Sequence, residues 1–355
     1  MIKKLLAAIL AFAMLFAFAG CTGTGNTQTT APENTDHIRE VKTKVAVTQG
    51  PMELGLAKLK TDRSYAYDVA SYADPQAAAE LIKNGSADIA ALPLDVAAKL
   101  FNETNGGVKI LSVTNLSYLH VVTSISSIQS VTDLKGKTVY ATGEGTAYEH
   151  IINYVLSENG VDPEKDVDIQ YNADADALVA QAINDKNGIF ILPEPYATNI
   201  VAGTVVETAE ESTTAAAQTD ATTEYKQTST TSIFGKKIDF AREWGKLKES
   251  PLAYGCIVAR TAYINENPEI ISEFMTFSEV SVNYIGANIE QATNFFTAGG
   301  YFDNNTLCYN SIISSNITFL EGDMMKAGVS EALDALYSAD SAHIGGAIPD
   351  ESFYY

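Results

Sequence analysis

The stretch KTVYATGEGTAYEHIINYVL, residues 137–156, is typical of a strand followed by a glycine-bracketed loop and a helix. Gly143 and Gly145 allow a ligand to approach the loop backbone closely, because glycine has no side chain. The start of the helix adds backbone N–H groups and the positive end of the helix dipole. Thr146 and Glu149 fit a capping box, which gives Thr146 a structural role as the alternative to ligand contact. We therefore predict that this loop binds a ligand.

The loop lacks residues that phosphate-binding glycine loops require. The Walker motif needs a lysine where Thr146 follows Gly145, and the dinucleotide fingerprint needs a glycine where Tyr148 stands. The carboxylate of Glu144 also opposes an anionic ligand. These departures favour simple ligand binding over phosphate chemistry.

Strands alternate with helices along the chain on both sides of this stretch, from residue 43 onward. Such alternation predicts an α/β fold with a largely parallel sheet and helices on both faces. The pattern indicates one lobe at 41–120 plus 250–355 and a second lobe at 121–249. Two crossings between the lobes would form a hinge, and the space between them would form a cleft. Two consecutive independent domains remain the alternative.

A threonine-rich segment interrupts the second predicted lobe. Residues 207–232 contain nine threonines and no Val, Leu, Ile or Phe. Such a composition cannot bury enough apolar surface to fold by itself. We predict a low-complexity insertion that forms a mobile loop or linker, with an edge hairpin as the alternative.

The N-terminus is typical of an exported protein. Two lysines precede a short apolar run, so residues 1–20 are predicted to be a signal peptide. The sequence FAGC resembles a lipobox, which predicts a lipid on Cys21, and residues 21–40 have the composition of a flexible tether. An ordinary signal peptide with a chance cysteine is the alternative.

Composition excludes several classes of function. A formal net charge of −21 disfavours binding to nucleic acids and to anionic lipid surfaces. Four scattered histidines without an HExxH motif disfavour a transition-metal site, and we expect no cofactor. Cys256 and Cys308 remain open to two interpretations, a disulfide or two buried free thiols.

Three further loops follow predicted strands, where α/β sheets present their ligand sites. Asp95 is either a ligand contact or a helix cap, and Glu194 is either a ligand contact or a solvated loop acid. Tyr140, Tyr148 and Tyr196 are candidates for stacking on a flat ring. The predicted ligand-binding residues are Thr48, Gln49, Gly50, Pro93, Asp95, Gly143, Glu144, Gly145, Thr146, Glu194 and Tyr196.

The order of motifs resembles a known family. The run SVTDLKGKTVYATGEGTAYEHIINYVLSENGVDPEKDVDIQY, followed by GIFILPEPYA, looks like the second lobe of ABC-transporter substrate-binding proteins. The resemblance is to the SsuA/THI5-like group of sulfonate, taurine, nitrate and thiamine-pyrimidine binders, and it covers roughly residues 41–355. AAELIKNGSADIAALP is similar to part of the first lobe. KNGIF and the threonine-rich insertion depart from the family pattern.

The resemblance implies a two-lobed, type II periplasmic-binding-protein-like clamshell with two hinge crossings. It implies a monomeric, lipid-anchored protein outside the cytoplasm that delivers a small molecule to an ABC permease, without catalysis. A sensing lipoprotein of the same fold is one alternative. A pyrimidine-synthesis enzyme is another, but the sequence lacks that enzyme's cysteine-rich motif. The acids Asp95, Glu144 and Glu194 favour a nitrogen-containing solute, with sulfonate and pyrimidine-like solutes as further candidates.

Overall fold

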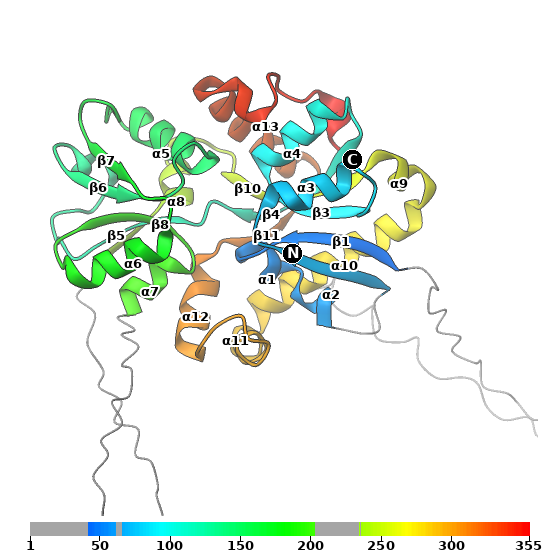
Figure 1. Ribbon diagram of the computed structural model, residues 1–355, viewed down its shortest axis with the longest axis horizontal. Coiled ribbons are helices and arrows are strands. Elements are labelled where there is room, and N and C mark those ends of the chain that lie inside the picture. Colours follow the sequence, from blue (N-terminus) through cyan, green and yellow to red (C-terminus); the bar gives the residue numbers. More distant parts are fainter. Residues whose placement is uncertain (1–41, 62–65, 203–233, 235) are drawn as a thin grey trace, which may run out of the picture. The chain divides into compact units, whose positions relative to one another are not determined.

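Two β-sheets organise the chain in the computed structural model (Figure 1). The first has six strands in the order β11-β4-β10-β3-β1-β2, and the second has five in the order β7-β6-β8-β5-β9. We call the first sheet with its helices lobe 1 and the second sheet with its helices lobe 2. The structure describes residues 42–61, 66–202, 234 and 236–355. The predicted signal peptide, Cys21, the tether and the threonine-rich insertion lie outside the described residues.

The bounds of the elements follow the predicted alternation of strands and helices. The strands are β1 (Thr43–Thr48), β2 (Tyr67–Tyr72), β3 (Ile89–Pro93), β4 (Val108–Leu116), β5 (Leu119–Thr123), β6 (Thr138–Ala141), β7 (Asp168–Tyr171), β8 (Ile189–Pro193), β9 (Lys236–Asp239), β10 (Ala253–Arg260) and β11 (Ile317–Leu320). The helices are α1 (Pro51–Gly55), α2 (Ala57–Thr61), α3 (Pro75–Lys83), α4 (Leu94–Glu103), α5 (Ala147–Glu158), α6 (Ala175–Asn184), α7 (Tyr196–Ala202), α8 (Phe240–Trp244), α9 (Thr261–Glu266), α10 (Pro268–Ala287), α11 (Ile289–Ala298), α12 (Asn305–Ser314) and α13 (Gly322–Ala339). Short 3₁₀ helices are η1 (Val131–Leu134), η2 (Ser341–Ile344) and η3 (Glu351–Phe353).

Both sheets are mixed, so the prediction of a largely parallel sheet is only partly right. In lobe 1, β1 runs parallel to β2 and β3, whereas β10 is antiparallel to β3 and β4. In lobe 2, β6 runs parallel to β7 and β8, whereas β5 is antiparallel to β8 and β9. The antiparallel strands β5 and β10 each enter their sheet directly from the other lobe, without the helical crossover that parallel neighbours need.

Lobe 1 buries both faces of its sheet. In β1, Val45 and Val47 belong to one buried cluster and Ala46 to another, as expected for side chains that alternate between faces. In β10, Cys256 and Ile257 divide in the same way. Helices α3, α4 and α13 supply the cluster on one face, and α1, α2 and α10 supply the cluster on the other.

The chain crosses between the sheets twice. The first crossing joins β4 to β5 through Ser117 and Tyr118. The second leads from α8 to β10, and Trp244 lies at its start with its side chain fully buried. The indole Nε1 of Trp244 donates to the carbonyl of Ser250 at 3.0 Å, and its ring lies 5.2 Å from that of Tyr154. These contacts fasten the second crossing to α5.

The C-terminal segment is fastened to α4, as the red and cyan elements of Figure 1 show. The side-chain amide of Asn102 donates to the carbonyls of Ile344 and Ala347 at 2.7 and 2.6 Å. The ring of Phe353 packs edge-on against Phe101 at a centroid distance of 5.1 Å. Asn102 lies seven residues after Asp95, so both side chains lie on the same face of α4. This face holds the C-terminal segment in place.

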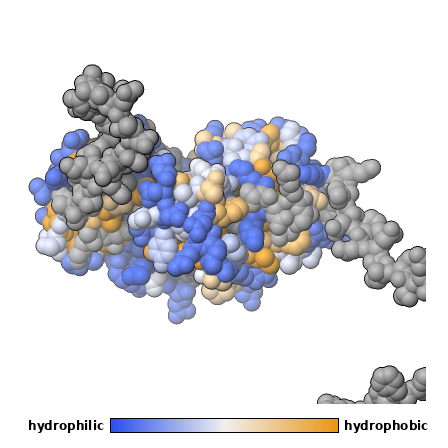
Figure 2. Space-filling model, turned by 90° about the horizontal axis from the view of Figure 1, so that it is seen from below, coloured by the Kyte–Doolittle hydropathy of each residue, from blue (hydrophilic) through white to orange (hydrophobic). Residues whose placement is uncertain are grey.

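The face shown in Figure 2 is mostly hydrophilic, with apolar residues scattered across it. Among the described residues, no helix has the length and apolar character that a membrane span requires.

Cys256 and Cys308 are both buried free thiols, so the disulfide interpretation is wrong. Burial raises the pKa of Cys256, and it raises the pKa of Cys308 to about 11. Because the thiolate is the reactive form, both thiols should resist a thiol reagent at pH 8 in the folded protein and react after denaturation. A Cys21→Ser protein treated with a disulfide-exchange reagent, with and without guanidinium, tests this. Absence of free thiols in guanidinium would contradict it.

Candidate functional site

The four predicted loops lie at the carboxyl ends of strands, where they join β1 to α1, β3 to α4, β6 to α5 and β8 to α7. The first two loops belong to lobe 1 and the last two to lobe 2. This is the end at which α/β sheets present ligand sites. The structure brings some of their residues to a cluster around Asp95 and others to a pocket beside Gly50.

The glycine loop between β6 and α5 adopts a conformation that requires glycine. Gly143 has a φ of +89° and Gly145 a φ of +70°. A Cβ atom on Gly143 would lie 2.8 Å from the Oγ1 of Thr146 and 2.8 Å from the Cβ of Tyr148. The loop therefore turns tightly against the first turn of α5, which fixes the position of Tyr148.

The predicted capping box at this helix is wrong in its pairing. The hydroxyl of Thr146 accepts the N–H of Tyr148 at 3.2 Å and donates to the carbonyl of Gly143 at 2.6 Å. The carboxylate of Glu149 accepts the N–H of Gly145 at 2.6 Å, one residue earlier than predicted. With positive φ at Gly143 and Gly145, the Thr146 hydroxyl and the Glu149 carboxylate each accept the N–H one residue earlier than predicted. The N–H groups of Gly145 and Tyr148 are therefore already hydrogen-bonded within the loop.

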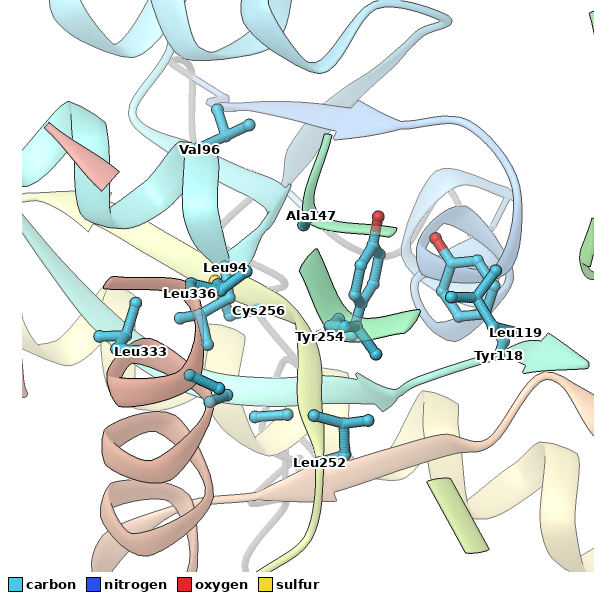
Figure 3. Close-up of a cluster of buried hydrophobic side chains, with 14 of the residues drawn as sticks. Leu94, Val96, Tyr118, Leu119, Ala147, Leu252, Tyr254, Cys256, Leu333 and Leu336 are labelled. Carbon is cyan, nitrogen blue, oxygen red and sulfur yellow. The ribbon is translucent and has the colours of Figure 1, made fainter. Parts of the chain in front are cut away.

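Three tyrosines from different parts of the chain meet in what we call the tyrosine cluster: Tyr118, Tyr148 and Tyr254. The rings of Tyr148 and Tyr254 are stacked, with centroids 5.1 Å apart and an interplanar angle of 11°. Tyr118 packs edge-on against both, at 6.2 Å from Tyr148 and 5.1 Å from Tyr254. Figure 3 shows Tyr118 and Tyr254 with their hydroxyl oxygens on the same side. The cluster joins α5, β10 and the first crossing.

The tyrosine cluster is held in its neutral form. Burial raises the pKa of Tyr118, Tyr148 and Tyr254 well above the usual range, and the nearby carboxylate of Asp95 adds to the rise. Because their folded pKa exceeds the unfolded value of about 10, the stability that the neutral phenols contribute is present below that pH and lost above it.

Absorbance at 295 nm tests the burial of these phenols. Tyr254→Phe should remove none of the titration amplitude observed up to pH 11, because Tyr254 stays protonated in the folded chain. In guanidinium, where burial is lost, the same substitution should lower that amplitude by the contribution of one phenol. An equal loss in the folded and the unfolded protein would contradict the prediction.

Asp95 lies beside the tyrosine cluster and is paired with a histidine from the C-terminal segment. Its Oδ2 lies 2.8 Å from the Nε2 of His343, and the residue is 7% exposed. The cap interpretation of Asp95 is wrong, because Pro93 is the N-cap of α4 and Asp95 caps no backbone N–H. The hydrogen bond that His343 donates to Asp95 raises the pKa of His343, whereas burial and the neighbouring His343 lower the pKa of His150.

Glu194 is buried, which contradicts the interpretation of a solvated loop acid. The residue is 2% exposed and precedes a cis peptide bond to Pro195. Its Oε1 lies 3.4 Å from the Nε2 of His120, and this same nitrogen lies 2.9 Å from the carbonyl of Ser314. The side chain thus forms part of a contact between β5, the β8–α7 loop and α12.

A pocket of about 280 Å³ lies beside the β1–α1 loop. Gln49 and Gly50 line it from lobe 1, and Pro195 lines it from lobe 2. Tyr301 and Phe302, which follow α11, form an aromatic part of its wall. The structure therefore brings two of the predicted loops together at this pocket.

The remaining predicted residues lie elsewhere. Thr48 donates from its buried hydroxyl to the carbonyl of Ala91. Glu144 is exposed. Tyr140 and Tyr196 are partly buried and pack on the lobe 2 core around Phe190, so their stacking on a ligand stays a prediction.

Sequence reasoning missed Tyr118, Tyr254 and His343. Tyr254 lies in the apolar run AYGCIVA, which indicates burial but gives no sign of a stacking partner. Asp95 and His343 are separated by 248 positions, and no local spacing connects them. For Tyr118, the available signal was the presence of an aromatic residue in the short link between β4 and β5.

A family model for the periplasmic substrate-binding proteins of phosphonate ABC transporters matches residues 56–188. This segment includes the β3–α4 loop, the first crossing and the glycine loop. No curated protein matches the chain.

Several solved structures share the fold. An ABC transporter from Parabacteroides distasonis is 18% identical, with a TM-score of 0.68, and the match covers 89% of this chain and 99% of that chain. The periplasmic aliphatic sulphonate binding protein SsuA from Escherichia coli is 13% identical, with a TM-score of 0.61 over 88% and 95% of the two chains. The alkanesulfonate-binding SsuA from Xanthomonas axonopodis pv. citri, bound to MOPS, is 13% identical, with a TM-score of 0.53 over 87% and 95% of the two chains.

At these identities, the likeness to the solved structures shows the two-lobed periplasmic-binding-protein fold. Together, the family-model match and the shared fold confirm the resemblance predicted from the sequence: the chain is similar to the periplasmic substrate-binding proteins of ABC transporters, the sulfonate and phosphonate binders among them.

Proposed function

We propose that the protein is the solute-binding component of an ABC importer and captures a flat, nitrogen-containing small molecule between Tyr148 and Tyr254. In this proposal the lobes 41–120 plus 250–355 and 121–249 move about the two crossings and close on the solute. The closed protein then delivers the solute to a membrane permease. The protein acts as a monomer and catalyses no reaction.

The stacked pair Tyr148 and Tyr254 carries this proposal. Tyr148 lies on α5 of lobe 2 and Tyr254 lies on β10 of lobe 1, so opening of the lobes would separate the two rings. Their centroids are 5.1 Å apart, whereas two rings that enclose a third need roughly 7 Å, twice the usual contact distance. In the structure, each ring therefore covers the face of the other ring that a flat solute would contact. A bound solute would replace this contact between the two rings.

The charge around the site favours a solute with N–H donors. The four predicted loops carry Asp95, Glu144 and Glu194 and contain no Lys or Arg. Asp95 is buried beside the tyrosine cluster, where a carboxylate interacts strongly with a cationic or N–H-bearing group. Sulfonates and phosphonates, which the relatives are named for, would face these carboxylates with only the helix N-termini in support.

The location outside the cytoplasm rests on the predicted signal peptide and on Cys21. We propose that a lipid on Cys21 anchors the mature chain to the cell membrane through the tether 21–40. Metabolic labelling with a tagged fatty acid tests this, because Cys21→Ser should abolish the label while the protein is still made.

Thermal unfolding in the presence of candidate solutes tests the proposed function. The panel contains aminopyrimidines, vitamins, amino acids, nitrate, sulfonates and phosphonates. A specific solute at 100 times its Kd should stabilise the folded protein by about 2.7 kcal/mol. A response to a nitrogen-containing class that Asp95→Asn weakens, and the exposed control Asp334→Asn does not, would support the proposal. A response to sulfonates or phosphonates alone would overturn the nitrogen preference, and no response to any class would count against solute capture.

A further inference from the structure

Three potential metal ligands meet where α5 approaches the C-terminal segment. His150 lies on α5, Asp340 follows the end of α13, and His343 lies in η2. One ligand atom from each of the three lies within 4.8 Å of the others. The two imidazole rings pack edge-on, with centroids 4.8 Å apart. Both histidines are partly buried and Asp340 is exposed, so an ion can reach the group from solvent.

We propose that His150, Asp340 and His343 bind a divalent first-row transition-metal ion, for which Zn²⁺ is the representative. Two imidazoles and one carboxylate are a donor set that suits Zn²⁺ and neighbouring metals better than Mg²⁺ or Ca²⁺. Three protein ligands leave a fourth tetrahedral position for water or another small molecule. The proposal contradicts the prediction that scattered histidines disfavour a metal site, because the fold brings two of the four together.

Asp95 supports the proposal independently of the three ligands. Its Oδ2 lies 2.8 Å from the Nε2 of His343, so the Nδ1 of His343 is the nitrogen left to bind an ion. Ligand histidines commonly pair their second nitrogen with a carboxylate, which fixes the orientation of the ring and raises its basicity. Asp95 is 7% exposed and lies in the first turn of α4. It would therefore act as a positioning residue.

Asp340 is also held in place, and it keeps a carboxylate oxygen that can bind a metal ion. Its Oδ1 accepts the N–H of Ala342 at 3.0 Å and caps η2, and a carboxylate has a second oxygen for an ion. Ligand atoms at about 2.1 Å from a tetrahedral Zn²⁺ lie about 3.4 Å apart. The observed separations of up to 4.8 Å therefore require an approach of about 1.4 Å, which rotations of His150 and Asp340 can supply.

An ion bound here would join the two lobes. His150 belongs to the helix that follows β6 of lobe 2, whereas Asp340 and His343 follow α13, which packs on the lobe 1 sheet. The ion would favour the arrangement in which α5 contacts the C-terminal segment. Metal binding at these three residues does not depend on which solute the protein binds.

Metal titration of the full mature chain without a histidine tag tests the proposal. After removal of metal with EDTA, Zn²⁺ is titrated by calorimetry and Co²⁺ by visible absorbance. We expect one ion per chain and the absorption bands of low-symmetry Co²⁺. His150→Gln and His343→Gln should lose this binding, and Asp95→Asn should weaken it about 10- to 100-fold.

Two aspartate variants provide the matched comparison. Asp340→Asn retains an oxygen for the Ala342 N–H, so the fold of η2 should persist while metal binding falls. Asp334→Asn changes an exposed acid on α13 and should bind the ion as the parent protein does. Circular dichroism of each metal-free variant checks the fold. Absence of saturable binding by the parent protein, or equal affinity in His150→Gln, His343→Gln and Asp334→Asn, would overturn the proposal.

Discussion

Replacing Phe353 by alanine is expected to lower the free energy of unfolding by about 3–5 kcal/mol. The side chain of Phe353 is fully buried, and its ring packs edge-on against Phe101 of α4. Removing it leaves a cavity between the C-terminal segment and α4, in addition to the loss of buried apolar area. Because the same segment carries His343, its contact with Asp95 should weaken as well. Chemical denaturation followed by circular dichroism measures the change in stability.

The neighbouring Tyr355 provides the control for this change. Its side chain is 52% exposed, and its backbone N–H, which any residue retains, donates to the carbonyl of Ile110. Tyr355→Ala should therefore alter stability by no more than about 0.5 kcal/mol. Similar losses in Phe353→Ala and Tyr355→Ala would contradict the view that the terminal segment is part of the lobe 1 core.

Replacing Tyr148 by alanine is expected to lower solute affinity by about 2 kcal/mol, or roughly 30-fold. In the proposed site the solute lies between the rings of Tyr148 and Tyr254, so the substitution removes one of its two stacking faces. Tyr148→Phe retains that face and should bind with affinity close to that of the parent protein. Calorimetry with the solute class that stabilises the parent protein measures the difference.

The exposed residue Tyr337 serves as the control for general effects of removing an aromatic side chain. Tyr337→Ala should leave solute affinity unchanged. If Tyr148→Ala bound the solute as tightly as Tyr337→Ala, stacking between Tyr148 and Tyr254 would not be the basis of recognition. A solute that bound only Tyr148→Ala would lead to the same conclusion.

The parts of the fold that could be predicted are those with a local physical cause. The helix α5 was predictable because its apolar stripe and its flanking glycines are adjacent in sequence. The cap of α3 was predictable for the same reason, and Asp74 accepts the N–H of Gln76 as such a cap should. In contrast, the antiparallel orientation of β10 depends on the path by which the chain returns from lobe 2. The residues of a strand do not indicate whether it runs parallel or antiparallel to its neighbours.

The site was less predictable because it is assembled from distant segments. The loops were identified at the ends of strands, but Glu194 is buried beside His120 of the neighbouring strand β5, a contact that local sequence does not reveal. The pairing of Asp95 depends on how the C-terminal segment docks on α4. The sequence shows which side chains can carry a charge. The residues with which these side chains interact are set by tertiary packing.

The position of Trp244 gives the protein an intrinsic optical probe. It is the only tryptophan among 355 residues, so excitation at 295 nm reports on a single ring. That ring is fully buried at the second crossing and lies against Tyr154 of α5. Emission of the resting protein should therefore be blue-shifted, and a motion that displaces α5 from the crossing should change its intensity. Stopped-flow fluorescence could then follow the kinetics of lobe movement in real time, with no dye attached to the chain.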